Sequence, residues 1–87
     1  MNTLFLLMAQ YNGKAVVLIE DVCRDYFSHL TPAKFIRKVD LGDLAIPVVR
    51  IEGSQKAAKG VHIEHLAAYI DERKEIAHRE YRKIHRL

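Results

Sequence analysis

Cysteine is almost missing from this 87-residue sequence, which contains only Cys23. A single cysteine cannot form a disulfide within the chain, so the small secreted scaffolds that depend on disulfides are excluded. A single cysteine is what we expect of a protein in the reducing cytoplasm. Cys23 itself lies in an apolar stretch and is expected to be a small buried hydrophobe.

Long hydrophobic runs are missing as well. The N-terminal MNTLFLLMAQ has no basic residue before its apolar run, and polar residues follow it directly. A signal peptide needs a basic start, and a membrane span needs about 20 apolar residues. We therefore interpret this stretch as a core element and predict no membrane partner.

Motifs for catalysis and cofactor binding are also missing from the sequence. It has no P-loop, no dinucleotide fingerprint and no Ser-His-Asp spacing. His62 and His65 share one side of a predicted helix start, but a metal site needs further ligands. Cys23 and His29 are the only obvious extras, and their spacing is not a recognised one. We predict no enzyme activity, no metal site and no cofactor.

The composition does support one small folded domain. Apolar residues make up 49% of the chain, and 87 residues are too few for two domains. No repeat or linker divides the sequence. We assign residues 1–73 to a single domain and residues 74–87 to a basic C-terminal helical extension.

The charges are sorted by sign along the chain. The net charge is +3, and residues 79–86 alone account for it. In the neutral remainder, Glu20, Asp21 and Asp25 fall together. The basic residues form two clusters, which are Lys34, Arg37 and Lys38, and Arg50, Lys56 and Lys59. Localised positive clusters indicate contact with a polyanion, whereas ordinary solvated charge is the simpler alternative.

Residues 3–18 allow two interpretations. Four residues have the spacing of one buried helical face: Leu4, Leu7, Met8 and Tyr11. Thr3 can cap such a helix, and Asn12-Gly13 can end it. Asn-Gly between two apolar runs is also the strongest short signal for a β-hairpin. We favour a helix over residues 3–11, followed by a short strand over residues 15–18.

Two further helices follow, with a three-residue break between them. The first is predicted over residues 19–27. Its apolar stripe consists of Ile19, Val22, Cys23, Tyr26 and Phe27. The second is predicted over residues 31–41, because Thr31 and Pro32 are preferred at a helix start and Gly42 can end the helix. Its inward residues are Phe35, Ile36 and Val39.

A hairpin and a last helix complete the chain. Residues 44–51, LAIPVVRI, are a strand candidate in which Pro47 favours an edge position or an irregular first part. Residues 50–60, RIEGSQKAAKG, form a loop that ends at Gly60, and Val61-His62 can return as a strand. The last helix is predicted from Ile63, and its charged part beyond residue 71 is expected to project from the domain.

Two helices with a short break, followed by a hairpin, is the order of a winged helix-turn-helix. We therefore predict an α+β fold, a small winged helix-turn-helix domain of the excisionase and MerR-like type, with a β-hairpin wing and a long C-terminal helix. Helix 31–41 would enter the major groove of DNA, and loop 50–60 would contact the backbone or minor groove. The candidate DNA-binding residues are Thr31, Lys34, Arg37, Lys38, Arg50, Ser54, Gln55, Lys56 and Lys59.

The sequence also resembles a known family. The segments MNTLFLLMAQYNGKAV, EDVCRDYFSHLTPAKFIRKV, PVVRIEGSQKAAKGVH and LAAYIDER, over about residues 1–73, resemble the PrtN-type pyocin activator proteins. These are small bacterial regulators of phage-tail-like bacteriocin genes. A looser resemblance links the chain to the winged-helix excisionase and phage activator group. The resemblance implies a sequence-specific DNA-binding transcription activator that acts at promoter boxes of pyocin genes during a damage response.

Other functions stay open at this point. An excisionase-like architectural DNA binder would share the fold without activating transcription. A protein-interaction module would use the basic tail, HREYRKIHRL, to bind an acidic partner. The tail can instead contact DNA or form a dimer helix, although Arg73 and Glu80 at seam positions argue against a stable coiled coil. The expected partners are double-stranded promoter DNA and RNA polymerase, with a homodimer or a cooperative array on DNA left open.

Overall fold

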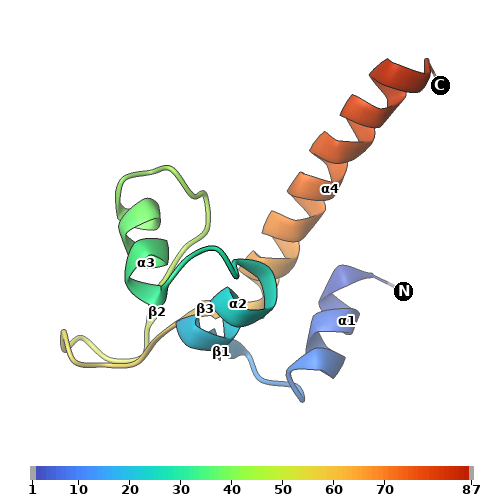
Figure 1. Ribbon diagram of the computed structural model, residues 1–87. Helices are drawn as coiled ribbons and strands as arrows, with labels where there is room; N and C mark the ends of the chain where they lie inside the picture. The colour runs from blue at the N-terminus through green and yellow to red at the C-terminus, as the bar shows by residue number, and fades with distance from the viewer. Residues whose placement is uncertain (1, 87) are drawn as a thin grey trace.

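A computed structural model describes residues 2–86 of the protein. Met1, the first residue of the predicted domain 1–73, and Leu87, the last residue of the predicted extension 74–87, lie outside the described residues. The elements are α1 (Thr3–Gln10), β1 (Val16–Leu18), α2 (Ile19–Tyr26), α3 (Pro32–Asp40), β2 (Val49–Arg50), β3 (Lys59–His62) and α4 (Ile63–His85). Within residues 2–86 these form an α+β fold with four helices and a three-stranded antiparallel sheet (Figure 1). The predicted fold class, a small winged-helix-like domain with a long C-terminal helix, is confirmed.

The first segment is a helix, so the helical interpretation is confirmed and the hairpin is wrong. Its cap is Asn2, whose side-chain oxygen accepts a 2.9 Å hydrogen bond from the Phe5 N–H. Thr3 was therefore the wrong cap, because the preceding asparagine already has the extended backbone that a capping residue needs. Asn12 and Gly13 end the helix as predicted, with φ of 55° and 75°.

The helix pair α2 and α3 forms at the predicted positions. The hydroxyl oxygen of Thr31 accepts a 3.2 Å hydrogen bond from the Lys34 N–H, so the predicted cap of α3 is confirmed. Phe27 from the break between the helices meets Phe35 of α3 edge to face, with ring centroids 5.1 Å apart. Phe35 is fully buried, and this contact fixes α3 against the end of α2.

The sheet has the strand order β1-β3-β2, which places β2 at an edge. Of the predicted strand 44–51 only Val49–Arg50 pairs, because the part around Pro47 is irregular, as the proline indicated. β3 starts two residues earlier than predicted. Gly60 therefore lies inside the sheet, opposite both Leu18 and Val49, and does not end the loop. A Cβ atom at Gly60 would lie 2.5 Å from the carbonyl oxygen of Val17, which only glycine avoids.

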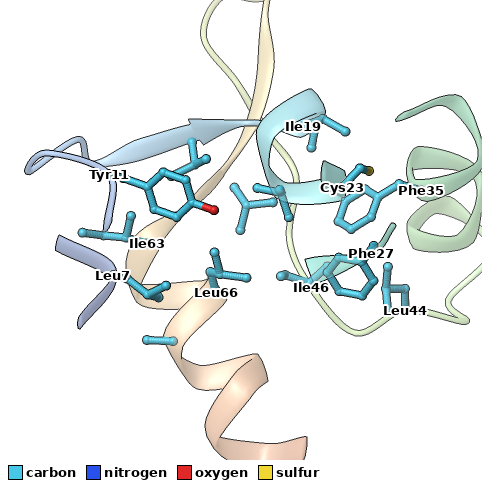
Figure 2. Close-up of a cluster of buried hydrophobic side chains, with 14 residues drawn as sticks. Leu7, Tyr11, Ile19, Cys23, Phe27, Phe35, Leu44, Ile46, Ile63 and Leu66 are labelled. Carbon is cyan, nitrogen blue, oxygen red and sulfur yellow. The ribbon is translucent and has the colours of Figure 1, made fainter. Parts of the chain in front are cut away.

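The core lies between the sheet and the helices and draws on all four helices (Figure 2). Its buried residues are Leu7, Tyr11, Val17, Ile19, Val22, Cys23, Phe27, Phe35, Leu44, Ile46, Val61, Ile63, Leu66 and Ala67. Two residues that were expected on the buried helix faces are exposed: the exposed fraction is 40% for Met8 and 39% for Tyr26. Tyr26 stays at the surface because its hydroxyl donates a hydrogen bond to Oε1 of Gln10.

The last helix, α4, continues directly from β3. The ring of His62 caps it, because Nδ1 accepts a 3.1 Å hydrogen bond from the Glu64 N–H. Only the first turns of α4 are buried in the domain, at Ile63, Leu66 and Ala67. The rest extends away from the other elements, as predicted, and gives the molecule a longest dimension of 51 Å (Figure 1).

Candidate nucleic-acid interface

Helix α3 presents a basic face to solvent. Lys34, Arg37 and Lys38 are all exposed, whereas Phe35 on the other face is fully buried. Residues three and four apart lie on one side of a helix, so these three cations share a face. The core contacts of α3 therefore determine which side chains point outward.

The N-terminus of α3 adds hydrogen-bond donors to this face. Thr31 uses its oxygen as an acceptor for the Lys34 N–H, so the hydroxyl hydrogen is still available for donation. Pro32 occupies the first turn, where a missing N–H costs nothing. Backbone N–H groups at a helix start attract anions such as phosphate.

The wing consists of β2, β3 and the connecting residues 51–58. At its root, Arg50 of β2 lies directly opposite Lys59 of β3. Like charges in this position destabilise a sheet, so the pair is unfavourable for folding alone. The Ile51 N–H donates to the Ala58 carbonyl oxygen at 3.0 Å and extends the pairing one step toward the tip.

The tip of the wing is shaped by its own side chains. The hydroxyl oxygen of Ser54 accepts a 3.2 Å hydrogen bond from the Lys56 N–H. This turn leaves the side chains of Gln55 and Lys56 exposed. Ser54 therefore stabilises the turn at the tip of the wing. Its hydroxyl hydrogen is still available for the predicted contact with DNA.

The six cations of α3 and the wing have no carboxylate within ion-pair distance among residues 2–86. They are Lys34, Arg37, Lys38, Arg50, Lys56 and Lys59. Arg24 on α2 behaves differently, since it pairs with Asp21 and with Asp25, each at 2.9 Å. Arg24 thus partly neutralises the acidic residues of its own helix, whereas none of the described carboxylates neutralises the basic clusters of α3 and the wing.

All nine predicted site residues lie on or next to α3 and the wing, which occupy the same side of the molecule (Figure 1). The projecting end of α4 points to the opposite side, and α1 also lies away from the wing. The basic tail is therefore not part of the α3–wing surface, which we define as those nine residues. In this view both sequence clusters lie on the side of the molecule away from α1 and the far end of α4.

The comparisons with known proteins identify the family. The family model described as pyocin activator protein PrtN matches residues 3–77. The chain belongs to this family. Neither the curated proteins nor the solved structures give a significant match. Membership supports a role in the regulation of pyocin genes, as the resemblance implied.

Sequence reasoning missed one polar network in this family member. The Tyr11 hydroxyl donates a 2.6 Å hydrogen bond to Oδ2 of Asp25, and Gln10 approaches the same oxygen at 3.5 Å. The Arg24 guanidinium, and then the Tyr11 hydroxyl, hold the pKa of Asp25 below its usual range. Burial, and then the bond to Asp25, raises the pKa of Tyr11. A buried tyrosine facing a helix with carboxylates was the signal that could have revealed the network.

Other kinds of site have little support in the described part of this family member. Residues 2–86 contain no group of three or more His, Cys, Asp and Glu side chains able to hold a metal ion. His62 is engaged in capping α4. Cys23 is buried, and burial raises the pKa of its thiol, which makes the reactive thiolate scarce. None of the helices in residues 2–86 is long and apolar enough to cross a bilayer.

Proposed function

We propose that this protein binds duplex DNA at pyocin gene promoters through the α3–wing surface and activates transcription there. The observation that supports the proposal most strongly is the set of six cations on α3 and the wing that form no ion pair within residues 2–86. The Arg50–Lys59 pair adds to it, because two cations facing each other across a strand pair favour an anionic ligand.

The dimensions of α3 suit this role. A helix with its side chains is about 10–12 Å wide, and the major groove of B-DNA is about 12 Å wide. Phe35 anchors one face of α3 in the core, so the opposite face carrying Arg37 would point into the groove. Arg37 would read a guanine through paired hydrogen bonds, while Thr31, Lys34 and Lys38 would position the helix.

The wing would supply affinity that does not depend on sequence. Arg50 and Lys59 at its root and Lys56 near its tip are suited to phosphate contacts, with Ser54 and Gln55 as short polar donors. Each neutralised phosphate releases counterions, so binding should weaken with salt at a logarithmic slope of about −0.9 per contact.

The first test is fluorescence anisotropy with a pyocin promoter duplex and a scrambled duplex of the same length, over a series of salt concentrations. We expect tighter binding to the promoter and a steep salt dependence. Lys38→Glu should nearly abolish binding. Lys83→Glu, the same change on α4, is the matched control and should have a small effect.

Three results would contradict the proposal: no binding at low salt, equal affinity for both duplexes, or equal losses for Lys38→Glu and Lys83→Glu. The last result would indicate that the tail binds the nucleic acid or an acidic partner. Transcription needs its own test, in which a promoter-reporter fusion is measured with and without the protein. A DNA binder that leaves reporter output unchanged would be architectural, like an excisionase, and would not position RNA polymerase.

A further inference from the structure

A cavity lies between the base of α4 and the break that joins α2 to α3. Its volume is about 310 Å³. α4 contributes four lining residues, which follow the three- and four-residue spacing of one helical face: Leu66, Tyr69, Ile70 and Arg73. The end of α2 and the break contribute the other three: Tyr26, Phe27 and His29. None of these belongs to the α3–wing surface, so the proposed DNA binding leaves the cavity unused.

The inner wall of the cavity is apolar. Phe27 and Leu66 are buried, and Tyr69 and Ile70 are half-buried against the core. The ring centroid of Phe27 lies 5.6 Å from that of Tyr69 and 5.1 Å from that of Phe35. One ring therefore lines the cavity and also holds α3. An apolar group that entered the cavity would be removed from water, which is the main favourable contribution to such contacts.

The charge at the rim of the cavity is positive. Arg73 and His29 are both exposed, and Arg73 forms no ion pair with another residue of 2–86. None of the lining residues is a carboxylate. An anionic group beside the opening would therefore gain charge-assisted hydrogen bonds from the guanidinium without displacing an existing ion-pair partner.

The distribution of polar groups indicates which kind of ligand the cavity suits. No charged side chain is buried anywhere in residues 2–86, so the interior offers no cation that would hold the carboxylate of a free small acid. Small-molecule sites depend on a few polar groups placed inside the pocket. A protein partner can instead insert one apolar side chain and keep its carboxylate at the rim, which is the usual arrangement of an interface anchor.

The size of the cavity agrees with this kind of occupant. Ligand pockets span about 300–1,000 Å³, and this cavity lies at the lower end of the range. It therefore suits a single large side chain better than an extended ligand. Aromatic side chains are the most frequent anchors of this type, because they bury a large apolar area for few rotatable bonds.

We propose that this cavity is a docking site for a protein partner, which inserts an aromatic side chain against Phe27 and Leu66 and places an adjacent carboxylate against Arg73. His29, whose ring centroid lies 6.3 Å from that of Phe27, adds a second polar group to the rim. The site is formed in the free chain and does not rest on the proposed DNA binding. Because the two surfaces share no residue, the protein could hold DNA and a second protein at the same time.

The chain contains no tryptophan, so the fluorescence of a tryptophan peptide reports its binding without a background from the protein. The probe is the peptide AEWEA, acetylated and amidated at its ends, titrated with the full chain in the absence of DNA. We expect a saturable blue shift with a dissociation constant below about 1 mM. The peptide AKWKA should bind about 5-fold more weakly or worse, and AESEA, which lacks the anchor, should not displace AEWEA. No saturable shift up to about 5 mM would overturn the proposal.

A charge reversal at the rim tests the role of Arg73. Arg73→Glu should weaken AEWEA by about 5-fold and strengthen AKWKA, since the carboxylate contact is replaced by repulsion. Arg79→Glu makes the same change on another side of α4, outside the cavity, and should leave both dissociation constants within about 2-fold. Equal losses of AEWEA binding in the two variants would mean that the peptide responds only to net charge, and the docking site would be wrong.

Methyl NMR spectra locate the bound peptide. The methyl signals of Leu66 and Ile70 should shift on addition of AEWEA, whereas those of Ile84, which is 78% exposed on α4 outside the cavity, should not. Unchanged signals of Leu66 and Ile70 would overturn the assignment. Free indole-3-acetate carries the same ring and a carboxylate. If it binds more tightly than AEWEA, the cavity is a small-molecule site and not a protein docking site. Failure of any of these tests leaves the DNA titrations unaffected, because no DNA is present.

Discussion

The hydroxyl of Tyr11 donates a 2.6 Å hydrogen bond to Oδ2 of Asp25, and this bond joins the end of α1 to α2. Tyr11→Phe keeps the buried ring and removes only the hydroxyl. We expect the free energy of unfolding to fall by about 1–2 kcal/mol, because a partly buried hydrogen bond to a charged acceptor is lost. Urea unfolding measures the change. Tyr26→Phe, which removes an exposed hydroxyl bonded to the neutral amide of Gln10, is the control and should cost less. Equal costs would show that the Asp25 bond adds nothing.

The same carboxylate should make stability depend on pH. The folded protein holds the pKa of Asp25 below its ordinary value of about 3.9, through Arg24 first and Tyr11 second. The stabilisation is therefore fully present above pH of about 4 and is lost as the pH falls through the lowered folded pKa. Unfolding free energies of the wild type and Asp25→Asn should thus differ near neutral pH and converge in acid. A difference that stays constant from pH 7 to pH 2 would rule out this titration.

Gly60 should tolerate no side chain. Gly60→Ala places a Cβ atom 2.5 Å from the Val17 carbonyl oxygen and 2.6 Å from Cγ1 of Val16. Because a backbone atom cannot move aside cheaply, we expect a loss of about 1–3 kcal/mol in the free energy of unfolding. Gly53→Ala in the wing, where nothing lies within 4 Å, is the matched control and should change stability by about 0.5 kcal/mol or less. A tolerated Gly60→Ala would mean that β1 and β3 lie further apart than described.

The division of work between α3 and the wing gives a prediction on DNA binding. Arg37→Ala should cost about 1–3 kcal/mol on the promoter site and reduce discrimination against scrambled DNA. Lys56→Ala should weaken both duplexes alike and lower the salt slope by about 1. Both are measured by the anisotropy titration described above. If the two variants affect promoter and scrambled DNA in the same way, base reading by α3 and phosphate binding by the wing are not separate tasks.

Much of the fold could be predicted because local signals agreed with one another. Thr31-Pro32 and Gly42 define α3 independently of tertiary contacts, and Asn12-Gly13 ends α1 through its left-handed backbone. The winged-helix order followed from the succession of these short signals. The α3 and wing clusters could also be identified in advance, since sorted charges are visible in the sequence itself.

The features that could not be predicted depend on contacts between distant segments. Gly60 looked like a loop end, because the sequence does not show that β1 passes alongside it. Tyr26 has the spacing of a buried residue, but its hydroxyl bonds to Gln10 on another helix and keeps the ring at the surface. Asn2 caps α1, and not the adjacent Thr3, because capping propensity alone does not distinguish two neighbouring candidates.

The direct passage from β3 into α4 has a mechanical consequence. His62 ends the strand, Ile63 begins the helix, and the His62 ring bonds to the first turn, so no hinge separates them. The root of the wing, the middle strand of the sheet and a helix of 23 residues, about 34 Å long, therefore form one continuous unit. Any contact that holds the wing in place also limits the directions in which the far end of α4 can point.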